Sequence, residues 1–276
     1  MKSKSQEVIA VIPNYNMAMQ LKTLLPSVLE QNYDAVYVLD DKSTDDSVSV
    51  VRSFGKRVRL VTGSTNLGAG GNRNRILCAI KSDAIIHFID ADVTFEQRNT
   101  ADYIRKIEIN DTIGFIGSLV YDSTGKQSIW NYGPRQTLSS AIAATILWAC
   151  IDTWLYPLIK PFYKHRPTLG KPYTKKDVYW VLEASLVIRI DTLRRLGGFD
   201  ESIREHDIQA LAYEAEKQGL RNVFDPSFAV TQHAVNVRKY NRNASKHKAE
   251  LYLAKKYGIW RWLFSLPSHN IQRDLN

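Results

Sequence analysis

Residues Ala84–Asp92 read AIIHFIDAD, and this stretch decides the fold. Its first six residues are apolar apart from His87, a composition typical of a strand that is buried on both faces. Two aspartates, Asp90 and Asp92, follow this strand at once. Ligands of open α/β sheets bind at the carboxyl ends of the strands, so the pattern predicts a site here.

The chain before and after this stretch alternates between strand and helix patterns. Further strands are predicted at Glu7–Ile12, Ala35–Leu39, Arg57–Val61, Val178–Ile190 and Val223–Val230. Helices are predicted at Met19–Leu29, from the capping residues Ser43, Thr44, Asp45 and Asp46 through Phe54, and from the glycine-rich loop Asn66–Gly71 to Ile80. This alternation predicts an α/β fold with a mainly parallel, twisted sheet and helices on both faces.

The composition is that of a globular protein, and the charge is unevenly distributed. The 276 residues are 44% hydrophobic and 24% charged, which excludes disordered, collagen-like and coiled-coil classes. Of the net charge of +9, Lys160–Lys176 contributes +6 and Gln232–Asn276 contributes +7, so the remainder is −4. An acidic body suggests a cation or sugar site. The basic segments suggest contact with phosphates of lipid or nucleotide, or merely a solvated surface.

The cysteines and the N-terminus point to a cytoplasmic protein. Cys78 and Cys150 are too few for a disulfide scaffold or a thiolate zinc site, and their apolar surroundings predict buried free thiols. The apolar run Val8–Pro13 is shorter than the core of a signal peptide. We therefore expect a cytoplasmic location, with peripheral contact at the cytoplasmic membrane face as a further option.

Polar motifs follow the predicted strands in a fixed order. They are Pro13-Asn14-Tyr15-Asn16, Asp40-Asp41-Lys42-Ser43-Thr44-Asp45, Asn66–Asn74, Asp90-Ala91-Asp92, Gly197–Glu201 and Glu205-His206-Asp207. Over about Val8 to His233, this set resembles family 2 glycosyltransferases with the GT-A fold. The resemblance implies an inverting, metal-dependent enzyme that moves a sugar from a nucleoside diphosphate, of UDP or dTDP type, to an acceptor hydroxyl. It further implies a role in assembling cell-surface polysaccharide, glycolipid or other glycoconjugate.

The same resemblance suggests how the chain is divided. Residues 1–235 would form the GT-A domain, with a nucleotide-binding half at 1–120 and an acceptor and catalytic half at 121–235. Residues 236–276 would form a basic, helical C-terminal extension. The partners expected are the nucleotide-sugar donor, a glycan or lipid-linked acceptor and an anionic membrane, with no nucleic acid.

Asp90 and Asp92 are the predicted metal ligands. A leaving diphosphate needs a divalent cation, and Mn²⁺ or Mg²⁺ prefers carboxylate and phosphate oxygens. The resemblance assigns direct coordination mainly to Asp92, and either metal or ribose to Asp90. His233 resembles a late histidine that reaches the metal or diphosphate in many GT-A enzymes. A capping Asp pair and an ordinary loop histidine are the structural alternatives.

The nucleotide is expected against the first three motifs. Asp41 resembles the family residue that accepts a hydrogen bond from the base N3–H, and Tyr15 offers an aromatic face or packs under the loop. Arg73 is similar to the family arginine that reaches nucleotide or diphosphate oxygens, although a lone helical arginine is often only solvated. Pro13, Asn16, Asn66, Gly68 and Asp90 complete the predicted nucleotide site.

Asp207 is the predicted general base, and Glu205 is the alternative. The resemblance places an acidic pair after the Gly-Gly-Phe-Asp segment, with its aspartate as base. Here His206 stands where the family has glutamate, Gln209 replaces a later acid, and a further arginine is missing. Trp180 and Glu183 precede this segment and are expected to line the acceptor site.

The stretch Leu138–Tyr163 is apolar and aromatic, and the basic run ending at Lys176 follows it. Its longest apolar run is too short to span a bilayer, so it indicates a membrane-surface helix, a core helix or an oligomer contact.

Two other functions are weighed. A non-catalytic GT-A scaffold that binds nucleotide or carbohydrate is the alternative. The glycine spacing argues against a dinucleotide-dependent oxidoreductase.

Overall fold

The computed structural model describes residues 6–107, 109–128, 131–133, 174–233 and 242–258. Cys150 and the stretch 138–173, with the predictions made for them, lie outside these residues.

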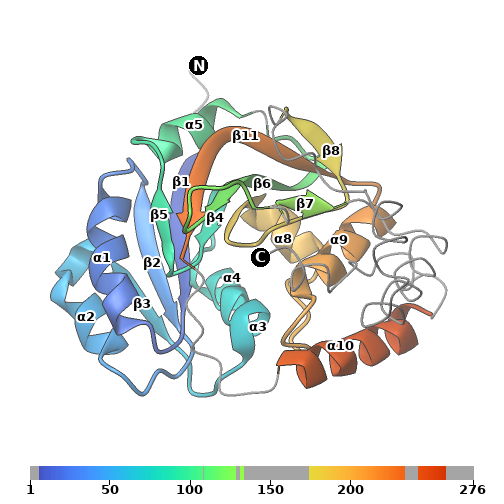
Figure 1. Cartoon of the computed structure of the whole chain (residues 1–276), viewed down its shortest axis with the longest axis horizontal. Helices are drawn as coiled ribbons and strands as arrows, with labels where there is room; N and C mark the ends of the chain where they lie inside the picture. Colours follow the sequence, from blue (N-terminus) through green and yellow to red (C-terminus); the bar gives the residue numbers. More distant parts are fainter. Residues whose placement is uncertain (1–5, 108, 129–130, 134–173, 234–241, 259–276) are drawn as a thin grey trace, which may run out of the picture.

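The first half of the chain forms the parallel part of one sheet (Figure 1). The strands are β1 (Glu7–Asn14), β2 (Ala35–Asp40), β3 (Arg59–Thr62) and β4 (Ala84–Ile89), in the order β3-β2-β1-β4. The helices between them are α1 (Ala18–Leu29), α2 (Ser47–Ser53), α3 (Gly68–Asn74) and α4 (Ile76–Ala79), with one 3₁₀ turn at Gly55–Arg57. Strand β4 has the predicted bounds, and β1 and β2 start as predicted.

The second half continues the same sheet. Strand β10 (Ser185–Arg189) lies antiparallel between β4 and β6 (Ile113–Asp122), and β11 (Arg221–Gln232) pairs parallel with β6. Strands β5 (Val93–Phe95) and β8 (Lys176–Val178) pair antiparallel with β11, while β7 (Tyr132–Gly133) and β9 (Trp180–Val181) form a two-stranded sheet. The remaining helices are α5 (Thr100–Lys106), α8 (Ile190–Arg195), α9 (Asp207–Lys217) and α10 (Arg242–Tyr257).

Apolar side chains are buried on both faces of this sheet. Along β1, Ile9 and Val11 enter a core cluster that includes residues of α4, α8 and α9, whereas Ala10 and Ile12 enter a second cluster with α1 and α2. Successive strand residues point to opposite faces, so an unbroken apolar strand needs helices on both sides. The predicted α/β architecture with a mainly parallel sheet is confirmed.

Beyond the C-terminal extensions of β1 and β2, three predicted strands have different bounds. Strand β3 begins at Arg59 rather than at Arg57, because Gly55–Arg57 forms a 3₁₀ turn. The stretch Val178–Ile190 contributes to three strands, because Lys176–Val178 pairs with β11, Trp180–Val181 pairs with β7, and Ser185–Arg189 pairs with β4 and β6. Strand β11 is longer than predicted and contains Pro226 within a register shift between Phe224 and Ala229. Proline has no N–H for the ladder, and an irregularity is where a strand tolerates it.

Two helical predictions are also corrected. Helix α2 begins at Ser47 with Asp46, one of the predicted capping residues, at its N-cap position, whereas the Ser43 hydroxyl accepts the backbone N–H of Asn16. The expected helix to Ile80 is two short helices, and Cys78 on the second is exposed rather than buried. Ile76 and Ile80 are buried there, since residues four apart share one helix face, and Leu77 is partly buried against the same core.

The predicted C-terminal extension contains α10, which packs beside α9 (Figure 1). Ala249 and Leu253 are buried against Ile203 and Ala210. Lys256 Nζ lies 2.7 Å from a carboxylate oxygen of Asp200. Within the described ranges, no helix combines the length and apolar character that crossing a membrane requires.

Candidate active site

The carboxyl ends of the parallel strands bring the predicted polar motifs to one edge of the sheet. Asn14 at the end of β1 is paired in register with Asp40 at the end of β2, and Asp90 directly follows the neighbouring β4. The Asn14 amide nitrogen donates to Asp40 Oδ1 at 2.9 Å. Asn16 has a left-handed backbone (φ 54°), and its side-chain oxygen accepts the N–H of Thr44. Pro13 and Tyr15 are half-buried beside this turn.

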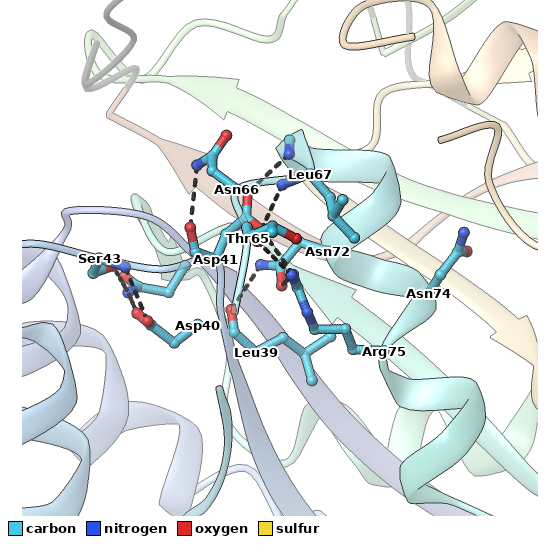
Figure 2. A network of polar contacts seen from close by, with 12 residues as sticks. Leu39, Asp40, Asp41, Ser43, Thr65, Asn66, Leu67, Asn72, Asn74 and Arg75 are labelled. Carbon is cyan, nitrogen blue, oxygen red and sulfur yellow. Dashed lines mark hydrogen bonds and ion pairs between the residues drawn. The ribbon is translucent and has the colours of Figure 1, made fainter. Parts of the chain in front are cut away.

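Asp41 organises the glycine-rich loop (Figure 2). Its buried carboxylate accepts the backbone N–H of Leu67 at 2.9 Å and that of Gly68 at 2.8 Å. The Asn66 amide nitrogen donates to the carbonyl oxygen of Asp41 at 3.1 Å. Gly68 has φ +82°, a conformation that side-chain-bearing residues rarely adopt. Asp41 therefore fixes the loop, and its role toward a nucleobase stays a prediction.

Arg75 is a member of this network that the sequence analysis missed (Figure 2). It donates to Asp41 Oδ1 at 2.7 Å, to Asn72 Oδ1 at 2.6 Å and to the carbonyl oxygen of Thr65 at 2.7 Å. The only signal in the sequence is the alternating run Asn72-Arg73-Asn74-Arg75.

Arg73 joins the two predicted halves of the site. Its side chain is 1% exposed and runs over the Phe199 ring, 5.5 Å from the ring centre. One terminal nitrogen lies 3.0 Å from Asp207 Oδ2, and the other lies 3.0 Å from Asp90 Oδ1. The guanidinium thus bridges a carboxylate at the end of β4 and one at the start of α9.

Negative charge accumulates around this guanidinium. Burial raises the pKa of Asp90 to about 7; Asp92 and Glu183 add to the shift, and Arg73 opposes it. Burial and the neighbouring Asp207 raise the pKa of the Glu183 carboxyl. Carboxylates whose ionisation is disfavoured by burial and by neighbouring negative charge would be stabilised by a bound cation.

Asp90 and Asp92 fit a magnesium- or manganese-type site. Asp92 is almost buried, and its backbone oxygen accepts the N–H of His233 at 2.9 Å, so His233 lies next to it. His233 Nε2 lies 3.2 Å from the Thr94 hydroxyl. Among the described residues, no cluster of three or more His, Cys, Asp or Glu side chains could enclose a metal. Mg²⁺ is typically held by one or two carboxylates plus substrate phosphates and water, which agrees with this sparse arrangement.

Hydrogen bonds with Asn74, the last residue of α3, hold the segment that leads to Asp207. Asn74 Nδ2 donates to the carbonyl oxygen of Phe199 at 2.9 Å, and the Phe199 N–H donates back to Asn74 Oδ1 at 2.8 Å. Gly198 has φ +78°, and a Cβ there would lie 2.6 Å from Asn74 Oδ1. Arg204 donates to the side-chain oxygen of Asn66 at 2.8 Å and to its backbone oxygen at 3.1 Å.

The predicted base residues lie at the start of α9. Asp207 is the first residue of the helix, and His206 before it has a left-handed backbone (φ 65°). Glu205, His206 and Asp207 are each 6% exposed. Such a backbone is uncommon for a residue other than glycine and often occurs at functional sites.

Comparison with known proteins identifies the family of this chain. The family model described as glycosyl transferase family 2 matches residues 9–148. The chain belongs to glycosyl transferase family 2.

Two curated relatives of this family 2 protein are glycosyltransferases by name. The amylovoran biosynthesis glycosyltransferase AmsB of Erwinia amylovora is 25% identical over 272 residues, which are 96% of this chain and 79% of AmsB. The poly(ribitol-phosphate) β-N-acetylglucosaminyltransferase TarS of Staphylococcus aureus is 27% identical over 112 residues, 38% of this chain and 18% of TarS.

Solved structures show that this chain has the GT-A glycosyltransferase fold. The mannosyltransferase PcManGT of Pyrobaculum calidifontis, in complex with GDP-Man and Mn²⁺, superposes with a TM-score of 0.58 at 19% identity, covering 93% of this chain. Residues 1–349 of S. aureus TarS with UDP-GlcNAc superpose with a TM-score of 0.58 at 16% identity, covering 92% of this chain. The family 2 chain spans 64% and 67% of these two structures.

The two predicted acceptor residues of the family 2 chain occupy different settings. Glu183 lies between β9 and β10, close enough to Asp207 and Arg73 for their charges to shift its pKa. Trp180 is 6% exposed in the core, where it packs so tightly on Gly133 that a Cβ there would meet the indole ring. The structure therefore brings Glu183 close to the predicted base, while the Trp180 ring is buried in the core against Gly133.

Proposed function

We propose that this protein is an inverting, metal-dependent glycosyltransferase that moves a sugar from a nucleoside diphosphate to an acceptor hydroxyl. The observation that carries the proposal is the ion pairing of Arg73 with both Asp90 and Asp207. This ion pairing links Asp90, one of the two carboxylates suited to holding a metal and its diphosphate, to Asp207, the carboxylate suited to deprotonating an acceptor.

Direct displacement at an anomeric carbon divides the work among these residues. A Mn²⁺ or Mg²⁺ ion held by Asp92 and Asp90, with His233 beside them, would neutralise the diphosphate that leaves. Asp207, or Glu205 as the alternative, accepts the proton of the acceptor hydroxyl as that oxygen attacks the opposite face of the sugar. One base and no enzyme nucleophile give inversion of configuration.

The donor is expected along the ends of β1 and β2. Tyr15 would face the base, and Asp41 would accept its N3–H. Pro13, Asn16, Asn66 and Gly68 would line the nucleotide. A uracil or thymine base has such an N3–H, which favours a UDP- or dTDP-sugar. The complex of TarS with UDP-GlcNAc supports the first, while the GDP-Man complex of PcManGT shows that the fold accepts a purine.

The acceptor is proposed to be a growing surface polysaccharide or a lipid-linked glycan; the poly(ribitol-phosphate) in the name of TarS supports a polymeric acceptor. Work on such an acceptor would take place in the cytoplasm, at the inner membrane surface. Residues 138–176 and the basic residues of 236–276 are the proposed peripheral contact. Lys248, Leu251 and Lys255 of α10 are exposed and consistent with it.

The test is a thermal-shift screen of nucleotide sugars with and without Mn²⁺, followed by detection of released nucleotide. A bound donor raises the melting temperature by mass action. We expect one UDP- or dTDP-sugar to stabilise the protein only with Mn²⁺ and to release its nucleotide when an acceptor is supplied. Metal-independent stabilisation without any release, across acceptors extracted from the native cell surface, would favour a non-catalytic binding scaffold.

A further inference from the structure

Arg73 has a setting that differs from that of an arginine reaching for a ligand. Both terminal nitrogens are engaged by carboxylates at 3.0 Å, and the side chain is 1% exposed. Its Nε is buried and lacks a hydrogen-bond partner among the described residues. A guanidinium committed in this way holds two protein groups at a fixed separation, because its N–H donors form a rigid fork.

The carboxylates that Arg73 holds come from segments far apart in the chain. Asp90 follows β4, and Asp207 opens α9, 134 residues beyond Arg73. The next residue, Asn74, fixes the Phe199 backbone, which leads into the same segment. The end of α3 therefore sets where α9 begins relative to the end of β4.

The charges make this link necessary. Asp90 and Asp207 each form an ion pair with Arg73, and Glu183 lies close enough to Arg73 and Asp207 for their charges to act on it. Without the guanidinium, repulsion would push Asp207 away from Asp90. Two ionised carboxylates keep a short separation when a cation lies between them; otherwise they move apart or one of them is protonated.

We propose that Arg73 is a positioning residue that holds Asp207 at its working distance from the metal carboxylate Asp90, and not a ligand of the nucleotide. The inference rests on the proposed function and assigns a role within that same site. Arg73 thus aligns the base that activates the acceptor with the donor's diphosphate. Arg75, which follows α3, instead contacts Asp41 of the predicted nucleotide site.

The experiment compares R73K and R73Q with a matched exposed arginine variant, R52Q, in the last turn of α2. Calorimetry measures the Kd of the donor's nucleoside diphosphate with Mn²⁺, and steady-state kinetics measures kcat and KM. For R73K and R73Q we expect a Kd within about threefold of wild type. We expect kcat to fall by about 10²-fold in R73Q, the scale of a misplaced general base, and by less in R73K. R52Q should match wild type in both measurements.

A double-mutant cycle tests the coupling itself. If Arg73 acts through Asp207, adding R73Q to D207N should lower kcat by less than about threefold, because residues acting as a unit are not additive. A rise of tenfold or more in the nucleotide Kd of R73K, or a full R73Q effect in the D207N background, would overturn the proposal.

R73K retains the positive charge that the buried carboxylates need, and nucleotide binding confirms that each variant is folded. Failure of the proposed function can be told apart from failure of the role proposed for Arg73. If the proposed function is wrong, the wild-type protein itself gives no turnover, and no fall in kcat can be measured in any variant.

Discussion

Lowering the pH should destabilise this protein through His87, the one polar residue of strand β4. His87 is fully buried, and its pKa is lowered to about 3 by that burial. Its ring nitrogens lie 2.6 Å from the Tyr33 hydroxyl and 2.7 Å from the Ser185 hydroxyl, and Phe228 packs edge-on against it. Both hydroxyls can donate or accept, so a neutral ring is fully hydrogen-bonded there.

The size of the effect follows from the two pKa values. The unfolded chain binds a proton at His87 below pH 6.5, whereas the folded protein stays neutral down to about pH 3. Stability due to this group is therefore complete above pH 6.5 and is lost as the pH falls toward 3. The loss is about 1.4 kcal/mol per pH unit, which gives about 2 kcal/mol between pH 7.5 and pH 5.0.

Urea denaturation at pH 7.5 and pH 5.0 measures this loss in wild type, H87Q and Y33F. H87Q cannot titrate, so its loss between the two pH values should be smaller than that of wild type by about 2 kcal/mol. Y33F removes a hydrogen bond but keeps the imidazole, and it should retain the wild-type pH dependence. Equal losses in wild type and H87Q would refute the reasoning and mean that His87 titrates normally in the fold.

Three further outcomes test the site and the membrane surface. D92A should abolish turnover, and EDTA should do the same to wild type; full activity in either case contradicts the metal assignment. D207N should keep the donor Kd while kcat falls by about 10²-fold, and the same loss in E205Q with a normal D207N would transfer the role of base to Glu205. Liposome flotation should show binding to anionic vesicles at low salt that weakens at high salt, since each basic residue of 160–176 near the surface contributes about 1 kcal/mol. Absence of flotation with anionic vesicles at low salt would contradict the proposed membrane contact.

The sequence predicts the strands best where a single local pattern determines them. Ala84–Ile89 has the predicted bounds because the apolar run is bordered by polar residues on both sides. Val178–Ile190 has an equally strand-like composition, yet it divides among three pairings. Which neighbour a strand pairs with depends on segments distant in sequence, and periodicity carries no information on that choice.

The site shows the same limit. The spacing of Asp90 and Asp92 after a strand is local and predicts their position at the sheet edge. The partners of Arg73 and Arg75 were not predictable, because residues two apart on a helix point about 200° apart and so meet different surroundings. One contacts Asp207, and the other contacts Asp41. Only the packed structure determines which carboxylate each one meets.

Strand β10 has a consequence for how this molecule can move. It is hydrogen-bonded antiparallel to β4 on one side and to β6 on the other, so both predicted halves share one continuous ladder. A hinge between them would have to break buried backbone hydrogen bonds in the middle of the sheet. Any movement that accompanies donor binding is therefore expected in the connections at the sheet edge. The sheet beneath these connections is expected to stay rigid.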